Sequence, residues 1–235
     1  ASSVLPAQAP ILFALVLQLV LAIVLSELAG GRLEVKALAM LGVLAAVGTI
    51  LRPLSAGTAG LELIFFLMIL GGRVFGPGFG FALGTITMFS SALLTSGVGP
   101  WLPHHMIAAG FVGLVAGLLP RASGRSELVL LAGYGFLAAF AYGWLMDFAF
   151  WPFILGGQTQ ISFDPSAGPV ENLHRFVLYN LATSMGWNLG RALTNAALVA
   201  VLGVPLLRLL RRTARRAGFE APDPAGILVR SDQLG

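Results

Sequence analysis

Seven long apolar runs, separated by short polar connections, organise the chain. A helix needs about 20 mostly apolar residues to cross a membrane, so each run predicts a span. The third run is short. The last two exceed what a bilayer requires, so we expect each to begin or end beyond the hydrocarbon or at its surface. The predicted spans are residues 9–29, 37–53, 61–74, 77–97, 104–120, 127–155 and 173–212.

The composition favours an integral membrane protein over a soluble one. The 235 residues are 57% hydrophobic and only 10% charged, whereas a soluble domain carries roughly 25% charged residues. The absence of cysteine excludes disulfides and thiolate metal sites. The net charge of +4 comes from short connections and a C-terminal cluster rather than from a basic face, so no nucleic-acid partner is expected.

The positions of arginine and lysine orient the predicted spans, because cytoplasmic connections are enriched in these residues. Alternate connections carry nearly all of them, and the other set has only Arg52 and Arg175 at its edges. This parity predicts that the N-terminus is outside and the C-terminus inside. The basic residues of the predicted inner side are Arg32, Lys36, Arg73, Arg121, Arg125, Arg208, Arg211, Arg212, Arg215 and Arg216.

Small residues recur at spacing four within the predicted spans. Such rows let helix backbones approach closely in a membrane. For the two rows rich in glycine we predict packing inside the protein. The third row suits internal packing and docking of another membrane protein equally well. The rows are Gly76, Gly80 and Gly84; Ala109, Gly113 and Gly117; and Gly42 with Ala46, with Ala39 on an adjoining part of that helix.

Three ionisable residues lie within the predicted spans: Glu62, Asp147 and Arg191. A charge at membrane depth costs at least roughly 2.5–3.5 kcal/mol, so it usually has a partner or a function. Asp147 and Arg191 fall at a similar depth near the outside. We predict an ion pair between them, either as a structural salt bridge or at the edge of a ligand cavity.

Aromatic and amide side chains concentrate toward the predicted outer face. All four tryptophans lie there, beside two adjacent histidines in the loop Ser96 to Gly110. Aromatic walls with a few polar groups are typical of a small-molecule site, and a histidine pair without nearby carboxylates gives no reason to expect a metal. The candidate ligand-binding residues are Trp101, His104, His105, Trp144, Asp147, Trp151, Trp187, Asn188 and Arg191.

Motifs for energy coupling and catalysis are missing from the sequence. It contains no GxxxxGK[ST] loop, no GxSxG and no HExxH. The pattern therefore favours a binding subunit without its own energy source. Two other classes stay open: a membrane enzyme that acts on a lipid or cofactor through Asp147, Arg191 and the histidines, and a purely structural subunit.

The order of features from residue 36 to 212 resembles one transporter family. ALAMLGVLAAVG (37–48) is a helix rich in small residues. FGPGFGFALG (75–84) places glycines at spacing four after a predicted inner turn, and GLVAGLLPR (113–121) ends a later helix. These features resemble the substrate-binding S component of energy-coupling factor (ECF) vitamin transporters, which are ATP-driven importers of the bacterial cytoplasmic (inner) membrane.

The resemblance implies an all-α membrane protein with a six-helix core. Residues 36–212 would form this core, residues 1–35 would add one N-terminal transmembrane helix and its connection, and residues 213–235 would form a cytoplasmic basic tail. In place of the AxxxA-like docking pattern of the family, this chain would have GxxxA, formed by Gly42 and Ala46. Ala39 would lie on an adjoining part of the same helix.

The resemblance also implies the function and the partners. The protein would capture a vitamin near the outer surface, with cobalamin favoured and a thiamine precursor as the alternative. It would deliver this ligand inward with a transmembrane T component and two cytoplasmic ATPase subunits. The ATP would be used by the partner subunits, so no enzymatic activity and no cofactor of its own are expected, and lipid would surround it.

Overall fold

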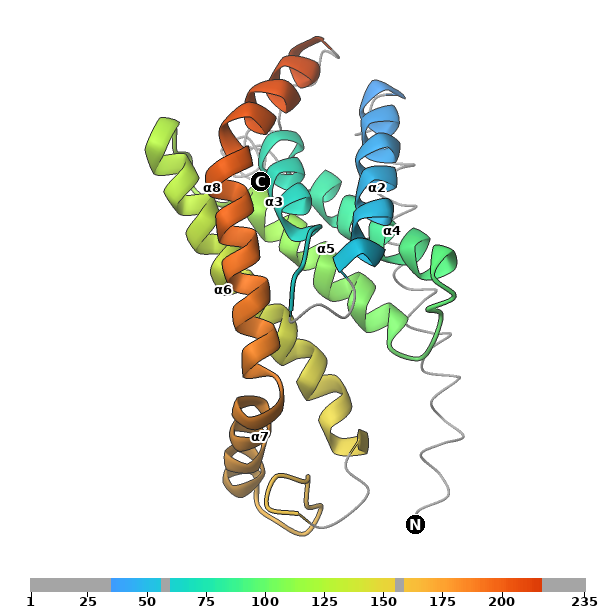
Figure 1. The fold of residues 1–235 in the computed structure, drawn as a ribbon, viewed down its shortest axis with the longest axis vertical. Coiled ribbons are helices and arrows are strands. Elements are labelled where there is room, and N and C mark those ends of the chain that lie inside the picture. The colour runs from blue at the N-terminus through green and yellow to red at the C-terminus, as the bar shows by residue number, and fades with distance from the viewer. Residues whose placement is uncertain (1–34, 56–59, 155–158, 217–235) are drawn as a thin grey trace, which may run out of the picture.

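The computed structural model describes residues 35–55, 60–154 and 159–216, and within these ranges the chain is built from helices and loops (Figure 1). The all-α prediction is therefore confirmed. The helices are α2 (Val35–Ser55), α3 (Phe65–Phe75), α4 (Pro77–Leu94), α5 (Leu102–Leu118), α6 (Gly124–Ile154), α7 (Pro169–Thr183) and α8 (Met185–Arg216).

Four of these helices are long and apolar enough to cross a membrane: α2, α4, α6 and α8. The helices α3 and α5 are shorter, at 11 and 17 residues. Almost all of α3 is buried, because it packs against α2, α4, α5, α6 and α8. The short α3 therefore forms the centre of the bundle. The predicted span at 9–29 lies outside the described residues.

The two glycine-rich rows pack against each other, as predicted. They lie on α4 and α5, which form the most extensive helix pair in the described bundle. A Cβ atom added to Gly113 would lie 2.5 Å from the carbonyl carbon of Gly80, and one added to Gly84 would lie 2.5 Å from that of Ala109. The helix backbones are thus in direct contact, which only residues without a larger side chain permit.

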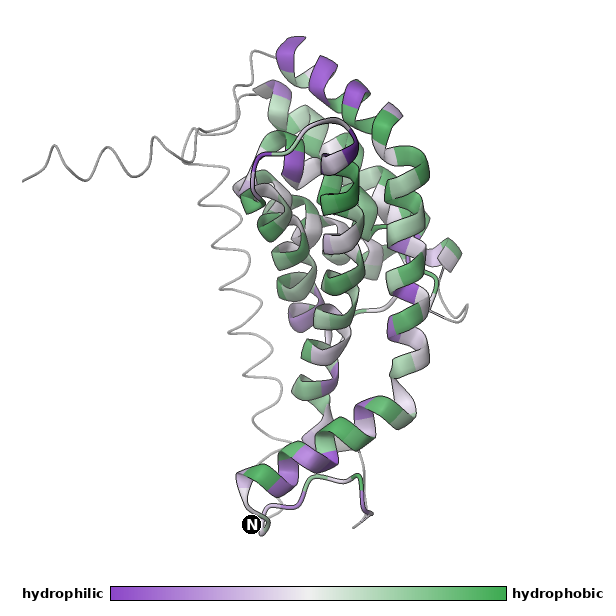
Figure 2. Cartoon of the chain, turned by 90° about the vertical axis from the view of Figure 1, so that its left-hand side faces the viewer, coloured by the Kyte–Doolittle hydropathy of each residue, from purple (hydrophilic) through white to green (hydrophobic). Residues whose placement is uncertain are grey.

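The predicted span at 173–212 is wrong as a single helix. The run begins inside α7 and is interrupted near Ser184, where α8 starts. In Figure 2, α7 lies across the lower end of the molecule and carries both hydrophilic and hydrophobic residues. Asn180 on α7 donates a hydrogen bond of 2.5 Å to Asp147 on α6. That part of this run lies at the membrane surface stays a prediction, and α7 is the segment to which it applies.

A buried carboxylate joins four helices at one end of the bundle, which we call the basic end. Glu127 on α6 is 2% exposed and accepts hydrogen bonds from Arg73 on α3 (2.8 Å) and Arg211 on α8 (2.5 Å). Arg73 also donates to the carbonyl oxygens of Leu119 and Pro120, just after α5, at 2.9 and 3.1 Å. Arg73 and Arg211, two of the basic residues that the sequence assigns to one side of the membrane, therefore lie together.

Candidate functional site

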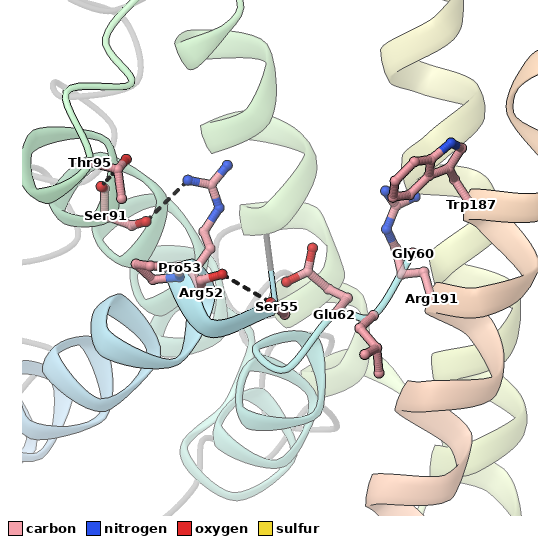
Figure 3. Close-up of a pocket in the computed structure, with 10 residues that line it drawn as sticks. Arg52, Pro53, Ser55, Gly60, Glu62, Ser91, Thr95, Trp187 and Arg191 are labelled. Carbon is pink, nitrogen blue, oxygen red and sulfur yellow. Dashed lines mark hydrogen bonds between the residues drawn. The ribbon is translucent and has the colours of Figure 1, made fainter. Parts of the chain in front are cut away.

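A cavity of about 250 Å³ opens at the ends of α2 and α4, opposite the basic end (Figure 3). Two segments complete it: the connection that leads into α3, and the first turns of α8. We call it the Arg52–Arg191 cavity, after the cations on its two sides. Its polar and aromatic lining residues are Arg52, Ser55, Glu62, Ser91, Thr95, Trp187 and Arg191.

Arg52 is positioned by the last turn of α2 and by α4. The Ser55 hydroxyl donates to the Arg52 carbonyl oxygen at 2.9 Å and so satisfies part of the helix end. The Arg52 guanidinium donates from Nη1 to the hydroxyl oxygen of Ser91 on α4 at 3.1 Å. This arginine therefore has a fixed place on one wall of the cavity.

A turn at Gly60, which contacts the start of α8, positions Glu62. Gly60 has φ +80°, which residues with a side chain rarely adopt. A Cβ atom there would lie 2.9 Å from the Cα of Trp187. The close approach fixes the connection against the start of α8, and Figure 3 shows Glu62 between Arg52 on one side and Trp187 with Arg191 on the other.

Arg191 on α8 is held by two neighbours. Its Nη1 donates to Asn188 Oδ1 at 3.0 Å, and its guanidinium carbon lies 5.1 Å from the ring centroid of Tyr142 on α6. This is a cation–π geometry, which stabilises a guanidinium more when water is excluded. The Tyr142 hydroxyl in turn forms a hydrogen bond with Nδ1 of His105 on α5. His105 therefore supports the cavity from behind.

The charged groups of the cavity do not pair with one another. Within the described part of the chain, no ion pair joins Glu62 to Arg52 or to Arg191. Glu62 Oε1 and Arg191 Nε are buried and have no hydrogen-bond partner there. Buried polar atoms without partners are costly. Such an arrangement suits a ligand that supplies both an acceptor and a donor.

The predicted ion pair between Asp147 and Arg191 is wrong. The ion pairs of the described residues do not include it. Asp147 instead accepts hydrogen bonds from Asn180 and Ser184. The Asp147 side chain meets Asn180 on α7, while Arg191 lines the cavity. The carboxylate thus fastens α7 to α6.

Trp151 and Trp144 pack mainly with other aromatic rings. Trp151 is 3% exposed, contacts Phe176 and Tyr179, and donates to the Ile161 carbonyl oxygen at 2.7 Å. Trp144 meets the edge of Phe176, with centroids 6.1 Å apart. This cluster stabilises the junction of α6 and α7 and contributes no lining to the Arg52–Arg191 cavity.

The predicted residues of the outer loop also lie away from the cavity lining. Trp101 is 48% exposed and donates to the Gly97 carbonyl oxygen at 3.2 Å. His104 meets the edge of the Phe150 ring. Among the predicted ligand-binding residues, Trp187 and Arg191 line the cavity. Asn188 contacts Arg191 directly. His105 contacts Tyr142, which in turn contacts Arg191.

Arg52, Ser91 and Thr95 are cavity residues that the sequence reasoning missed. Arg52 carried a usable signal, because it is a basic residue at the end of a span whose other basic residues lie on the opposite side. Ser91 and Thr95 share one face of α4 at spacing four, and nothing in their sequence context separates them from packing residues. Over the described ranges, no three His, Asp or Glu side chains gather as metal ligands.

The fold and the cavity define a class of protein: a helical membrane protein with a cavity lined by charged and polar residues opposite its basic end. Residues 36–210 match the family model described as ECF transporter, substrate-specific component, and the chain belongs to this family. Members of this family are transporter components rather than enzymes, and they associate with T and ATPase subunits in general. Comparisons with curated proteins and with solved structures found no match.

Proposed function

We propose that the chain captures a vitamin or related micronutrient in the Arg52–Arg191 cavity and releases it inward without chemical change. The single observation that supports this site is the convergence of Arg52, Glu62 and Arg191 on one cavity without pairing among themselves. Charged side chains in a membrane protein normally find partners. A bound ligand would supply them here.

Two cargoes carry over from the family resemblance: cobalamin, which it favours, and a thiamine precursor. The cavity of about 250 Å³ lies below the roughly 300–1,000 Å³ of typical ligand pockets. Cobalamin would bind only if the cavity opened further, whereas a single-ring vitamin suits the volume as it stands. The volume therefore favours the smaller cargo.

Calorimetric titration of the purified protein with cobalamin and with a thiamine precursor tests the proposal. We expect saturable binding of a vitamin at one site per chain and no turnover of the bound molecule. Conversion of the ligand by the isolated protein would favour the membrane enzyme. An absence of binding to any vitamin would favour a structural subunit.

The face of α2 formed by Ala39, Gly42 and Ala46 is our proposed docking site for the T component. All three residues are exposed among the described residues, and a Cβ atom at Gly42 would meet no described atom within 4 Å. Small residues of this kind let another membrane helix approach closely. Gly42→Leu should reduce copurification of the T component and both ATPases while sparing ligand binding. Gly133→Leu on α6, a site equally open in the described structure, is the matched control; equal loss in both variants would contradict the docking site.

The proposed orientation places the cavity outside the cell and the basic end inside. The native chain has no cysteine, so single cysteines report accessibility directly. Ser166→Cys, in the exposed loop before α7, should react with a membrane-impermeant maleimide in intact cells. Ser123→Cys, exposed just before α6 at the basic end, should react only after permeabilisation. The reverse pattern would overturn the orientation.

A further inference from the structure

We propose that the ligand of the Arg52–Arg191 cavity carries an anionic group, a carboxylate or a phosphate, beside an N–H or O–H donor. This inference rests on the proposed function and specifies the chemical class of the cargo. The lining holds two guanidinium groups and one carboxylate. A neutral ring without polar groups would leave both guanidinium groups without an oppositely charged partner and Glu62 Oε1 without a donor.

The basic end of the same protein shows how this fold treats arginines that serve only structure. There Arg73 and Arg211 both donate to Glu127, and Arg73 uses its remaining N–H groups on backbone carbonyl oxygens. Those two arginines therefore share an ionic partner, the buried carboxylate of Glu127. The arginines of the basic end have a carboxylate partner and those of the cavity have none among the described residues, so the two sites compare the same residue type within one structure.

Arg191 is held rigidly but incompletely satisfied. Asn188 and the Tyr142 ring fix its guanidinium, yet the buried Nε finds no acceptor in the described residues. Arg52 commits Nη1 to the neutral hydroxyl of Ser91. A guanidinium presents a planar fork of donors that matches a carboxylate or a phosphate. Both guanidinium groups therefore have N–H donors available for an acceptor on the ligand.

Glu62 sets the second requirement. An ionised carboxylate only accepts hydrogen bonds, and its buried Oε1 receives none from the part of the chain that the structure describes. Figure 3 places Glu62 between the two cations. A ligand that offers its anion to the arginines and a donor to Glu62 satisfies all three groups. With two positive charges against one, the cavity favours a ligand with net negative charge.

Matched pairs of probes separate charge from shape. The first two pairs are pantothenate with panthenol and biotin with biotinamide, which test a carboxylate. The third is hydroxymethylpyrimidine phosphate with the unphosphorylated pyrimidine, which tests a phosphate. Each probe is titrated calorimetrically into the full chain in detergent. We expect at least one anionic member to bind at least about tenfold more tightly than its neutral partner, since charge-assisted hydrogen bonds are the strong ones.

Two variants of opposite expected effect keep the test independent of folding. Arg52→Gln should lose about tenfold or more of the affinity for the anionic probe and little of that for its neutral partner. Glu62→Gln removes the opposing charge, so affinity for the anion should be kept or increased. Arg175→Gln, on α7 and outside the cavity lining, is the matched control and should bind as the wild type does.

Each outcome decides one point. A neutral member that binds as tightly as its anionic partner overturns the charge inference and leaves the binding function intact. Equal losses in Arg52→Gln and Arg175→Gln also overturn it. If no probe binds, and cobalamin does not bind either, both this inference and the proposed function fail.

Discussion

Replacing Gly113 by alanine tests the direct contact between the backbones of α4 and α5. The new Cβ atom would lie 2.5 Å from the carbonyl carbon of Gly80 and 2.9 Å from its Cα. Real Cβ atoms essentially never come within 3.0 Å of such an atom, so the helices must separate or distort. Overpacking of this kind costs roughly 1–3 kcal/mol.

Alanine also gains helix propensity over glycine, by about 1 kcal/mol, and this gain partly offsets the clash. Gly133→Ala on α6 carries the same gain without the clash, because nothing described lies within 4 Å of its added Cβ atom. The difference between the two variants therefore isolates the contact. We expect Gly113→Ala to be the less stable by roughly 1–3 kcal/mol.

Thermal unfolding in detergent, followed by circular dichroism, measures this difference. For a chain of this size about 2–4 °C of Tm corresponds to 1 kcal/mol, so the two variants should differ by several degrees. Equal melting temperatures for Gly113→Ala and Gly133→Ala would refute the close packing of the two glycine rows.

Three further predictions concern the basic end and the site. Glu127→Gln should lower the free energy of unfolding by about 3 kcal/mol, because it leaves two arginines without an ionic partner. Glu171→Gln, at an exposed ion pair, should change this free energy by less than about 1 kcal/mol. Similar shifts in melting temperature for the two variants would contradict this. Gly60→Ala should weaken ligand binding about tenfold through roughly 1–2 kcal/mol of strain at its positive φ, and unchanged calorimetric affinity would oppose the placement of Glu62. His105→Ala should weaken ligand binding, because the His105–Tyr142 hydrogen bond supports Arg191, whereas Trp101→Ala, outside the cavity lining, should bind as the wild type does; equal calorimetric affinities for the two variants would contradict this.

Much of the fold could be predicted because membrane helices have two features that are recognisable in a sequence: long apolar runs and rows of small residues. The apolar runs of α2, α4, α5 and α6 are recognisable from length and composition alone. The glycine rows at Gly80 and Gly113 indicate close packing by spacing alone, and the structure confirms it. Both signals are local, so neither requires knowledge of which helices are neighbours.

The boundary between α7 and α8 could not be predicted from hydropathy. Apolar residues continue on both sides of Ser184, and the nearest glycine, Gly186, lies inside α8 rather than at the break. The direction of α7 depends instead on Asn180 meeting Asp147 from another helix. This tertiary hydrogen bond is not visible in either segment taken separately.

The cavity shows the same limit of sequence reasoning. Depth along the chain suggested that Asp147 would meet Arg191, but depth does not give rotation about the helix axis. The two side chains leave their helices in different directions, toward α7 and toward the cavity. Arg52 became significant only when the fold brought it beside Glu62.

Native mass spectrometry of the full chain, extracted mildly from cells grown in rich medium, tests the central claim most directly. We predict that the wild type retains one small molecule per chain, and that the Arg52→Gln, Arg191→Gln double variant loses it while keeping its helical circular dichroism spectrum. A wild type without any bound molecule, or a double variant that retains the molecule as the wild type does, would contradict the assignment of the Arg52–Arg191 cavity as the substrate-binding site.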